Sequence, residues 1–339
     1  MQKLKTIDKR TIYQFFIKNS IYVFLILLIS VIIVMDPSVV SVTSLSIIIG
    51  QSATRIIFAL GVAGLLIMGG VDLSVGSLVG FAALLSASML QSPDHFNVLF
   101  PNLNLPLLVP VLIAMVVTAF FSFGQGIAVA QFRVPPFISS LAASLIVYGI
   151  CSIYYASVAG SAPVGGLRPE FTYLNREGIE IFGVRISYLF FIAVACAIVV
   201  WVIWNKTTLG RNMFAIGGNR NAARVSGVGV VRNMLTVYIL AGLLYGLGGV
   251  FEGSRTGSAS NLLGQGYELD AMAACVIGGV SMRGGVGTVR GVILGVFILQ
   301  IINYGLVFVR ISPDVQYVVK GAIILIAVLA DTKKNAMID

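Results

Sequence analysis

The sequence contains few charged residues. Of its 339 residues only 10% are charged, whereas 58% are hydrophobic, and the mean hydropathy is +0.99. Soluble domains carry about 25% charged residues, so 13 acids and 22 bases cannot cover the surface of a soluble protein of this size. Long, continuous apolar runs, such as Tyr22–Met35 and Ile192–Trp204, also differ from the short alternating segments of an outer-membrane barrel. The sequence therefore predicts an all-α polytopic membrane protein.

Residues that carry metal and acid–base chemistry are also scarce. The chain has one histidine, His95, and no G-x4-G-K-[ST] loop, which excludes a multi-histidine metal site and a phosphate-binding loop of that type. Its three cysteines lie in apolar segments without CxxC or Cys/His spacing, as expected of small core residues: Cys151, Cys196 and Cys275. We therefore expect no catalytic residue, no metal site and no cofactor, and we expect that the chain is not an enzyme.

A membrane-spanning helix needs about 20 apolar residues, and ten stretches meet this expectation. They lie near residues 20–35, 43–69, 74–91, 107–130, 137–158, 186–204, 234–254, 266–283, 288–310 and 315–331. Two of them are weaker, because 43–69 contains Gln51 and Arg55 and 266–283 contains Asp270. We interpret residues 1–339 as a single transmembrane domain of about ten helices.

The distribution of basic residues predicts the orientation of these helices. With the N-terminus inside, 15 Lys and Arg fall in the inner segments and five in the outer loops, and bases collect on the cytoplasmic side of membrane proteins. The net charge of +9 is thereby explained without a nucleic-acid partner. Both termini are predicted to be cytoplasmic, with an N-terminal segment 1–19, a loop 205–233 and a tail 332–339 on that side.

Glycine is abundant, with 37 residues concentrated in several spans. Small residues allow close helix packing in lipid, so we predict Gly-rich helix packing. Segments 69–80 and 284–295 share the pattern GGVxxxxGxxxG. This similarity is either a trace of an internal repeat or chance.

The few acidic residues near the spans have two interpretations each. Asp72 either caps a helix that starts near Ser74 or acts as a gate, and Asp270 is a second candidate for such a role. Arg55 either snorkels or pairs with an acid, or it lines a path. An ion-driven transporter generally places carboxylates near the bilayer midplane, whereas the three candidates here, Asp72, Glu252 and Asp270, each lie near a span end.

The loop 205–233 carries five bases and no acid. In it, Asn219 can cap a short helix, Arg220–Ser226, which Gly227 can close. Small apolar residues among the arginines suit a helix that sits in a groove of a partner protein. A positively charged surface helix without a partner is the alternative.

The same loop resembles a known family. Residues Gly210–Val228 are similar to the cytoplasmic coupling segment of monosaccharide permeases of ATP-binding-cassette (ABC) importers, the family that includes ribose, xylose and arabinose permeases. Further matches cover most of the chain: Ala59–Gly64, Gly70–Gly76, Val134–Ile138 and Glu268–Ser281. Other stretches most resemble the permeases for galactose and methyl-galactosides: Gln51–Ile57, Trp204–Thr207, Asp270–Cys275, Ile302–Leu306 and Gln316–Ile324.

This resemblance implies an assembly in the bacterial cytoplasmic (inner) membrane. It would hold two copies of the permease as a homodimer, an ATPase with two cassettes that hydrolyses ATP, and a periplasmic sugar-binding protein. The helix that docks into the ATPase would comprise the following residues: Asn219, Arg220, Ala222, Ala223, Arg224, Ser226 and Gly227.

Two further sets of residues are candidates for contacts outside the coupling helix. The longest outer loop carries charges that could receive the binding protein, although such a loop is usually only solvated: Arg168, Glu170, Arg176, Glu177, Glu180 and Arg185. Polar residues in apolar spans could line the path of an uncharged sugar or only join helices: Gln51, Asn303 and Tyr304. The alternative functions are import of ribose or another pentose, and ion-coupled secondary sugar transport.

Overall fold

The computed structural model describes residues 20–160 and 162–336, which form two compact units. The smaller unit holds α2 (Ser20–Met35), the 3-10 helix η1 (Pro37–Val39), α14 (Pro313–Ala336) and the last turns of α13 (Val289–Phe308). The predicted cytoplasmic segment 1–19 lies outside the described residues. The predicted tail 332–339 begins inside α14, so its first five residues are helical.

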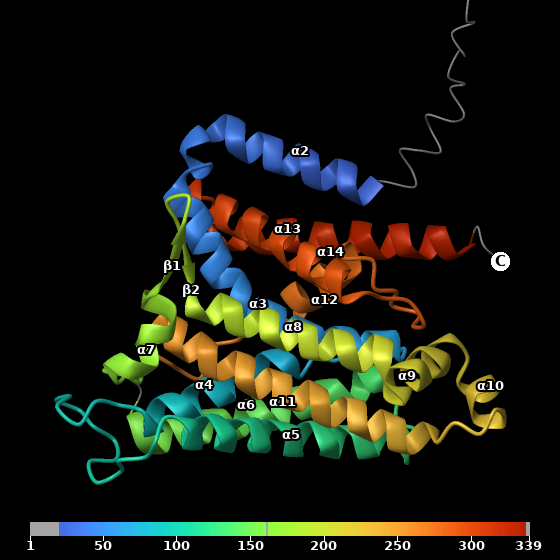
Figure 1. Ribbon diagram of the computed structural model, residues 1–339, viewed down its shortest axis with the longest axis horizontal. Coiled ribbons are helices and arrows are strands. Elements are labelled where there is room, and N and C mark those ends of the chain that lie inside the picture. The colour runs from blue at the N-terminus through green and yellow to red at the C-terminus, as the bar shows by residue number, and fades with distance from the viewer. Residues whose placement is uncertain (1–19, 161, 337–339) are drawn as a thin grey trace, which may run out of the picture. The chain divides into compact units, whose positions relative to one another are not determined.

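The larger unit, residues 42–300, contains the remaining helices (Figure 1). They are α3 (Val42–Ile67), α4 (Val75–Met89), α5 (Leu108–Ala130), α6 (Pro136–Ala159), α7 (Pro169–Arg176), α8 (Tyr188–Lys206), α9 (Thr208–Gly218), α10 (Arg220–Val225), α11 (Val230–Thr256), α12 (Tyr267–Ile277) and most of α13. A helix therefore occupies each of the ten predicted positions.

Six of the described helices are long and apolar enough to cross a membrane: α3, α5, α6, α8, α11 and α13. The prediction of a polytopic helical membrane protein is confirmed, and the count of ten spans stays a prediction. The helix α12 has only 11 residues, about half of the ~20 that a span requires. It begins after Gly266 (φ 84°) and ends before Gly279 (φ 83°), both in the left-handed region.

The expectation of an all-α chain is wrong for one short segment of the predicted outer loop. Strands β1 (Gly178–Ile181) and β2 (Val184–Ser187) form an antiparallel hairpin in which Glu180 pairs with Arg185. Its two turn residues, Phe182 and Gly183, both have positive φ, as a two-residue type I′ turn requires. This hairpin and α7 lie at one end of the larger unit, and α9 and α10 lie at the opposite end (Figure 1).

The helix α5 shows how the larger unit fits a lipid environment. Its exposed stripe is apolar at four-residue spacing: Leu108, Leu112, Val116 and Phe120. Its buried stripe is small or polar and includes Ala114, Thr118, Ser122 and Gln125. This distribution is the reverse of that on a soluble helix, where the apolar stripe faces the core.

The centre of the larger unit is α11, which packs against α3, α4 and α5. A Cβ atom added at Gly242 would lie 2.7 Å from the Ala119 Cα atom of α5, and one at Gly246 would lie 2.6 Å from the Met115 Cα atom. Only glycine permits two helix backbones to approach so closely. These contacts agree with the predicted Gly-rich packing.

Helices α3 and α12 each end in a turn of the same type. Gly69 (φ 77°) donates to the Leu66 carbonyl and Gly70 to the Leu65 carbonyl; Gly279 (φ 83°) and the following residue, Val280, repeat both bonds after α12. This pair of bonds is the Schellman motif. By this shared turn Gly69 corresponds to Gly279, which lies five residues before Gly284, the residue that the GGVxxxxGxxxG pattern aligns with Gly69.

Candidate functional site

The short helix α10 is capped as the sequence predicts. The Asn219 side chain accepts hydrogen bonds from the Asn221 and Ala222 amides at 3.0 and 2.9 Å, which are the bonds of an N-cap. Gly227 (φ 83°) follows the helix and donates to the Arg224 carbonyl. The helix ends at Val225, one residue before the predicted end, with Ser226 as its C-cap.

The residues of α10 differ in accessibility. Ala223 is 5% exposed and packs within this chain, and its place in the coupling set stays a prediction. Ala222, Arg224 and Ser226 are exposed and Arg220 is half-buried. Val225, which the sequence analysis did not include in the coupling set, is 89% exposed. An apolar side chain this exposed beside arginines marks the accessible face of the helix.

Positive charge gathers around α10. Burial and the neighbouring guanidinium groups of Arg224 and Arg133 lower the pKa of Arg220. Arg133 follows α5 and Arg220 begins α10, so the tertiary fold brings these cations together. A cationic surface of this kind attracts an anionic partner surface.

The helix α9, which the sequence analysis did not predict, connects α10 to the membrane helices. A Cβ atom added at Gly217 would lie 2.6 Å from the Gly285 amide nitrogen and would overlap the Ile67 carbonyl oxygen. The Gly285 amide itself donates to the Ile67 carbonyl at 2.8 Å. The end of α9, the end of α3 and the turn at Gly284–Gly285 therefore meet backbone to backbone.

Asp72 is fully buried and accepts four hydrogen bonds. Its Oδ1 atom accepts from the Ser74 amide (2.8 Å), the Ser74 hydroxyl (2.6 Å) and the Gln125 amide group (3.3 Å), and its Oδ2 atom accepts from the Tyr245 hydroxyl (3.0 Å). The first two bonds are those of a residue that organises the start of α4. The others attach this start to α5 and α11. A role as gate stays a prediction.

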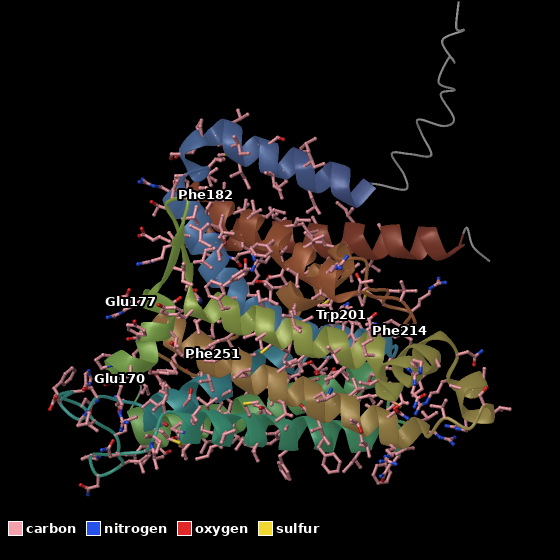
Figure 2. All side chains as sticks on the ribbon, in the orientation of Figure 1. Glu170, Glu177, Phe182, Trp201, Phe214 and Phe251 are labelled. Carbon is pink, nitrogen blue, oxygen red and sulfur yellow. The ribbon has the colours of Figure 1, made fainter. Side chains whose placement is uncertain are left out.

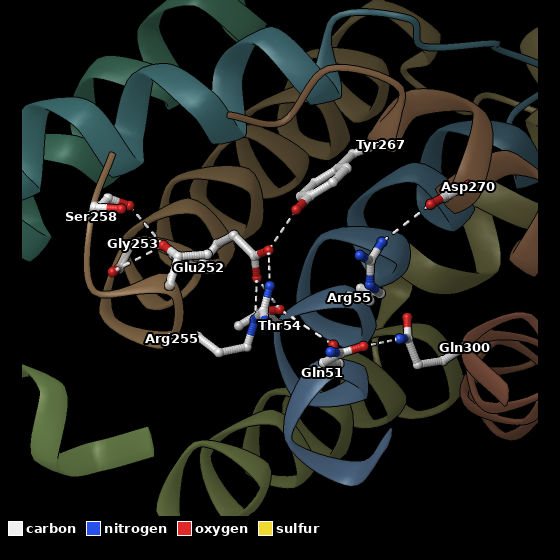
Figure 3. Close-up of polar contacts among 11 residues, drawn as sticks. Gln51, Thr54, Arg55, Glu252, Gly253, Arg255, Ser258, Tyr267, Asp270 and Gln300 are labelled. Carbon is white, nitrogen blue, oxygen red and sulfur yellow. Dashed lines mark hydrogen bonds and ion pairs between the residues drawn. The ribbon is translucent and has the colours of Figure 1, made fainter. Parts of the chain in front are cut away.

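A second buried carboxylate, Glu252 of α11, is the centre of the network in Figure 3. It accepts from the Thr54 hydroxyl and the Tyr267 hydroxyl, both at 2.6 Å, and from two nitrogens of Arg255 at 2.6 and 3.0 Å. Glu252 is 0% exposed. Because buried charges require partners, these four bonds hold α3, α11 and α12 in one arrangement.

Arg55 and Asp270 form an ion pair at 3.2 Å between α3 and α12. The Arg55 guanidinium also lies over the Tyr267 ring, 4.7 Å from its centroid. Of the interpretations given for Arg55, this geometry is that of pairing with an acid. Sequence reasoning identified both residues but had no means to pair them across 215 positions.

The three path candidates fall in different units. Gln51, in the larger unit, accepts a hydrogen bond from the Gln300 side chain (Figure 3). Asn303 and Tyr304 belong to the smaller unit, where the Tyr304 ring packs against Phe308 with centroids 5.7 Å apart. The hydrogen bond of Gln51 joins two helices, which is the alternative role given for it above. A role of Gln51, Asn303 or Tyr304 in the sugar path stays a prediction.

The predicted docking charges are not equivalent. Arg168 is half-buried and donates to the Leu105 and Leu103 carbonyls at 2.9 and 3.3 Å, so its guanidinium is engaged in holding a loop of this chain. The other five are exposed: Glu170, Arg176, Glu177, Glu180 and Arg185. The hairpin tip adds Phe182, which is 100% exposed and lies with Glu170 and Glu177 at one end of the larger unit (Figure 2).

Within the described residues no cluster of three or more His, Cys, Asp or Glu could hold a metal ion. Cys151 and Cys275 are buried, Cys196 is half-buried, and all three are free thiols.

Comparison with known proteins gives consistent matches over nearly the whole chain. A family model described as branched-chain amino acid transport system / permease component matches residues 44–328. The galactose/methyl galactoside import permease proteins MglC of Escherichia coli (strain K12) and Haemophilus influenzae are 46% and 44% identical to the chain, each over 98% of it and 99% of the relative. The ribose import permease protein RbsC of Bacillus subtilis is 32% identical over 92% of both chains.

No solved structure matches the chain significantly. The family model covers more than half of the chain, and the relatives align from end to end. The resemblance to sugar-importer permeases that the motifs indicated is confirmed. The chain belongs to the family of transport-system permease components that includes the galactose/methyl galactoside and ribose import permeases.

Proposed function

We propose that this protein is the membrane-spanning permease subunit of an ABC importer for galactose and methyl-galactosides. The observation that carries the proposal is a difference in identity over more than nine-tenths of the chain. The identity is 44–46% to the galactose/methyl galactoside permeases of Haemophilus influenzae and Escherichia coli, against 32–33% to the ribose permeases of Bacillus subtilis and Escherichia coli. The chain provides the path and does not catalyse a reaction; ATP is hydrolysed on a partner ATPase with two cassettes.

The coupling helix of this importer is α10. The exposed side chains of Ala222, Arg224 and Val225 offer a small apolar surface with positive charge, which suits a groove with acidic walls. The glycine contact between α9, α3 and the 284–285 turn supports this role, because a movement of α10 carried by α9 would reach the end of α3 with no side chain between the two backbones.

The opposite end of the larger unit receives the sugar-binding protein from the periplasm. The exposed charges of α7 and the hairpin, together with Phe182, offer an aromatic anchor surrounded by polar groups, a combination common at protein interfaces. With α10 cytoplasmic, both termini are cytoplasmic and the chain crosses the inner membrane about ten times. Two copies form the complete path, to which Gln51, Asn303 and Tyr304 contribute.

The ion-coupled alternative requires a carboxylate that can bind and release a cation during transport. The buried carboxylates in the described part of the chain are Asp72, Glu252 and Asp270, and each accepts hydrogen bonds or an ion pair from a neighbouring helix. Loss of any one charge would leave buried donors unpaired. This observation favours an importer that is driven by ATP.

The test is uptake of labelled galactose into proteoliposomes that contain this chain, the ATPase and the binding protein. We expect uptake to require ATP and the binding protein and to be unaffected by excess ribose. ATP-driven uptake of ribose but not galactose would assign the other sugar. Uptake driven by a proton or sodium gradient without ATP would refute the proposal.

A further inference from the structure

A half-polar cavity lies between the start of α3, α7, the hairpin and the end of α11. Its volume is about 350 Å³, at the lower end of the ~300–1,000 Å³ usual for small-ligand sites. Its walls combine apolar side chains such as Val42 and Ile47 with amide, hydroxyl and charged groups. All of them belong to the larger unit.

One polar atom in this wall has no partner. Ser187 occupies the N-cap position of α8, but its side chain makes no capping hydrogen bond. The residue is only 5% exposed, and its buried Oγ atom has no hydrogen-bond partner. An unpaired buried hydroxyl costs free energy. Ser187 lines the cavity, so rotation about its Cα–Cβ bond would bring this shielded hydroxyl to a ligand with hydroxyl groups there.

Other polar groups are arranged around the same space. A Cβ atom added at Gly50 would lie 3.7 Å from the Asn175 Oδ1 atom and 4.0 Å from the Ser187 Oγ atom, so both side chains approach the α3 backbone at this glycine. Arg255 lines the cavity, and its guanidinium is held by two bonds to Glu252. Fixed polar groups of this kind orient a ligand at little entropic cost.

The charge of the lining indicates the class of ligand. Glu180 and Arg185 are opposite each other across the hairpin, and Arg255 is neutralised by Glu252. The wall therefore presents both hydrogen-bond donors and hydrogen-bond acceptors, and it has no net charge that would select an ion. A neutral, polyhydroxylated molecule with apolar C–H faces matches this mixture of polar groups and aliphatic side chains.

We propose that this cavity is a binding site for a free monosaccharide within the permease itself, with Ser187, Asn175 and Arg255 as its polar contacts. The inference rests on the proposed function and adds to it a site between the binding protein and the interior of the path. A transit site must release its ligand, so its affinity is low. The exposed positions of Glu180 and Arg185 agree with a site that opens to solvent.

The test is protection of a cysteine from a small thiol reagent. Ser187→Cys is introduced into the full chain, the complex with its ATPase is placed in lipid nanodiscs, and the rate of reaction with a methanethiosulfonate reagent is measured while galactose is titrated. Galactose at ten times its Kd leaves about one site in eleven free, so the reaction is expected to slow about tenfold. The half-protecting concentration gives the Kd.

Three controls make the result specific. Phe182→Cys, at the fully exposed tip of the same hairpin, is expected to react at a rate independent of galactose. The unsubstituted chain measures the reaction of Cys151, Cys196 and Cys275. Betaine replaces galactose to separate binding from an osmotic effect. If Ser187→Cys does not fold, Asn175→Cys provides the same measurement from a half-buried position.

Several outcomes would overturn the site. Reaction rates that do not change with galactose, or thiols at both positions that never react, would show that the sugar does not enter the cavity. Protection by the binding protein alone, with none by galactose, would assign the cavity to the partner protein instead. ATP-driven uptake of galactose without protection of the cysteine would refute this site but support the proposed importer function. Protection without ATP-driven uptake would support the site but refute the proposed importer function.

Discussion

Replacement of Glu252 by glutamine tests the buried network most directly. The substitution preserves shape but removes the charge that pairs with Arg255, and it places an amide NH2 group among the donors of Thr54, Arg255 and Tyr267. Removal of one partner from a buried ion pair costs about 3–5 kcal/mol. At roughly 2–4 °C per kcal/mol, the apparent Tm should fall by roughly 6–20 °C.

The chain contains its own reporter for this measurement. Cys151 and Cys275 are 2% and 0% exposed, so a maleimide dye that fluoresces on reaction with thiols follows unfolding of the purified permease in detergent. Scans are compared at one heating rate, because unfolding of membrane proteins is often irreversible. Glu170→Gln on the exposed surface of α7 is the matched control and should leave the apparent Tm unchanged.

A double variant separates the charge pair from simple loss of a side chain. With Arg255→Gln added to Glu252→Gln, no uncompensated charge remains, so the pair should lose less stability than the sum of the single variants. The reasoning would be refuted if the double variant lost as much stability as the two single variants together. It would also be refuted if Glu252→Gln had the same apparent Tm as the unsubstituted chain.

Three other substitutions give distinct outcomes. Val225→Glu, at the 89% exposed position of α10, should leave the apparent Tm unchanged but abolish coupled uptake in proteoliposomes; full uptake would contradict docking of this face. Asn219→Ala removes two capping bonds and should cost about 1 kcal/mol, seen as a Tm fall of a few degrees. Gly242→Val should prevent recovery of folded protein because α11 can no longer approach α5. Its control, Gly149→Ala in open space on α6, should be neutral or stabilising by up to about 1 kcal/mol.

Local features of this chain could be predicted from sequence. The ten helix positions follow from apolar length, and the Asn219 cap and the Gly227 closure follow from the preference of these residues for helix ends. Each depends on residues within a few positions of one another. The Asn219 cap depends only on backbone amides within the next three residues, which is why the local sequence pattern was enough to predict it.

Features that depend on tertiary contacts could not be found in this way. Thr54 and Glu252 are separated by 198 positions, and no local pattern pairs them. Ala223 was expected on a docking surface, but its burial depends on how α10 packs. The hairpin was missed because its strands have only four residues each, too short for alternation to be clear. The Phe182–Gly183 turn was the available signal, since glycine supplies positive φ there.

The placement of the buried charges limits how energy can enter the transport cycle. Asp72, Glu252 and Asp270 are each engaged in bonds that hold helices together, so protonation of any of them would loosen packing before it could move a substrate. By contrast, α10 presents an exposed apolar side chain at one end of the larger unit. Through α9 it reaches the end of α3 by direct backbone contact at Gly217. A force applied at α10 can therefore shift α3 while the buried network keeps α3, α11 and α12 together as a unit. Because the start of α3 lines the same cavity as Ser187, this one helix joins the end where we place ATP-driven movement to the end where we place the sugar.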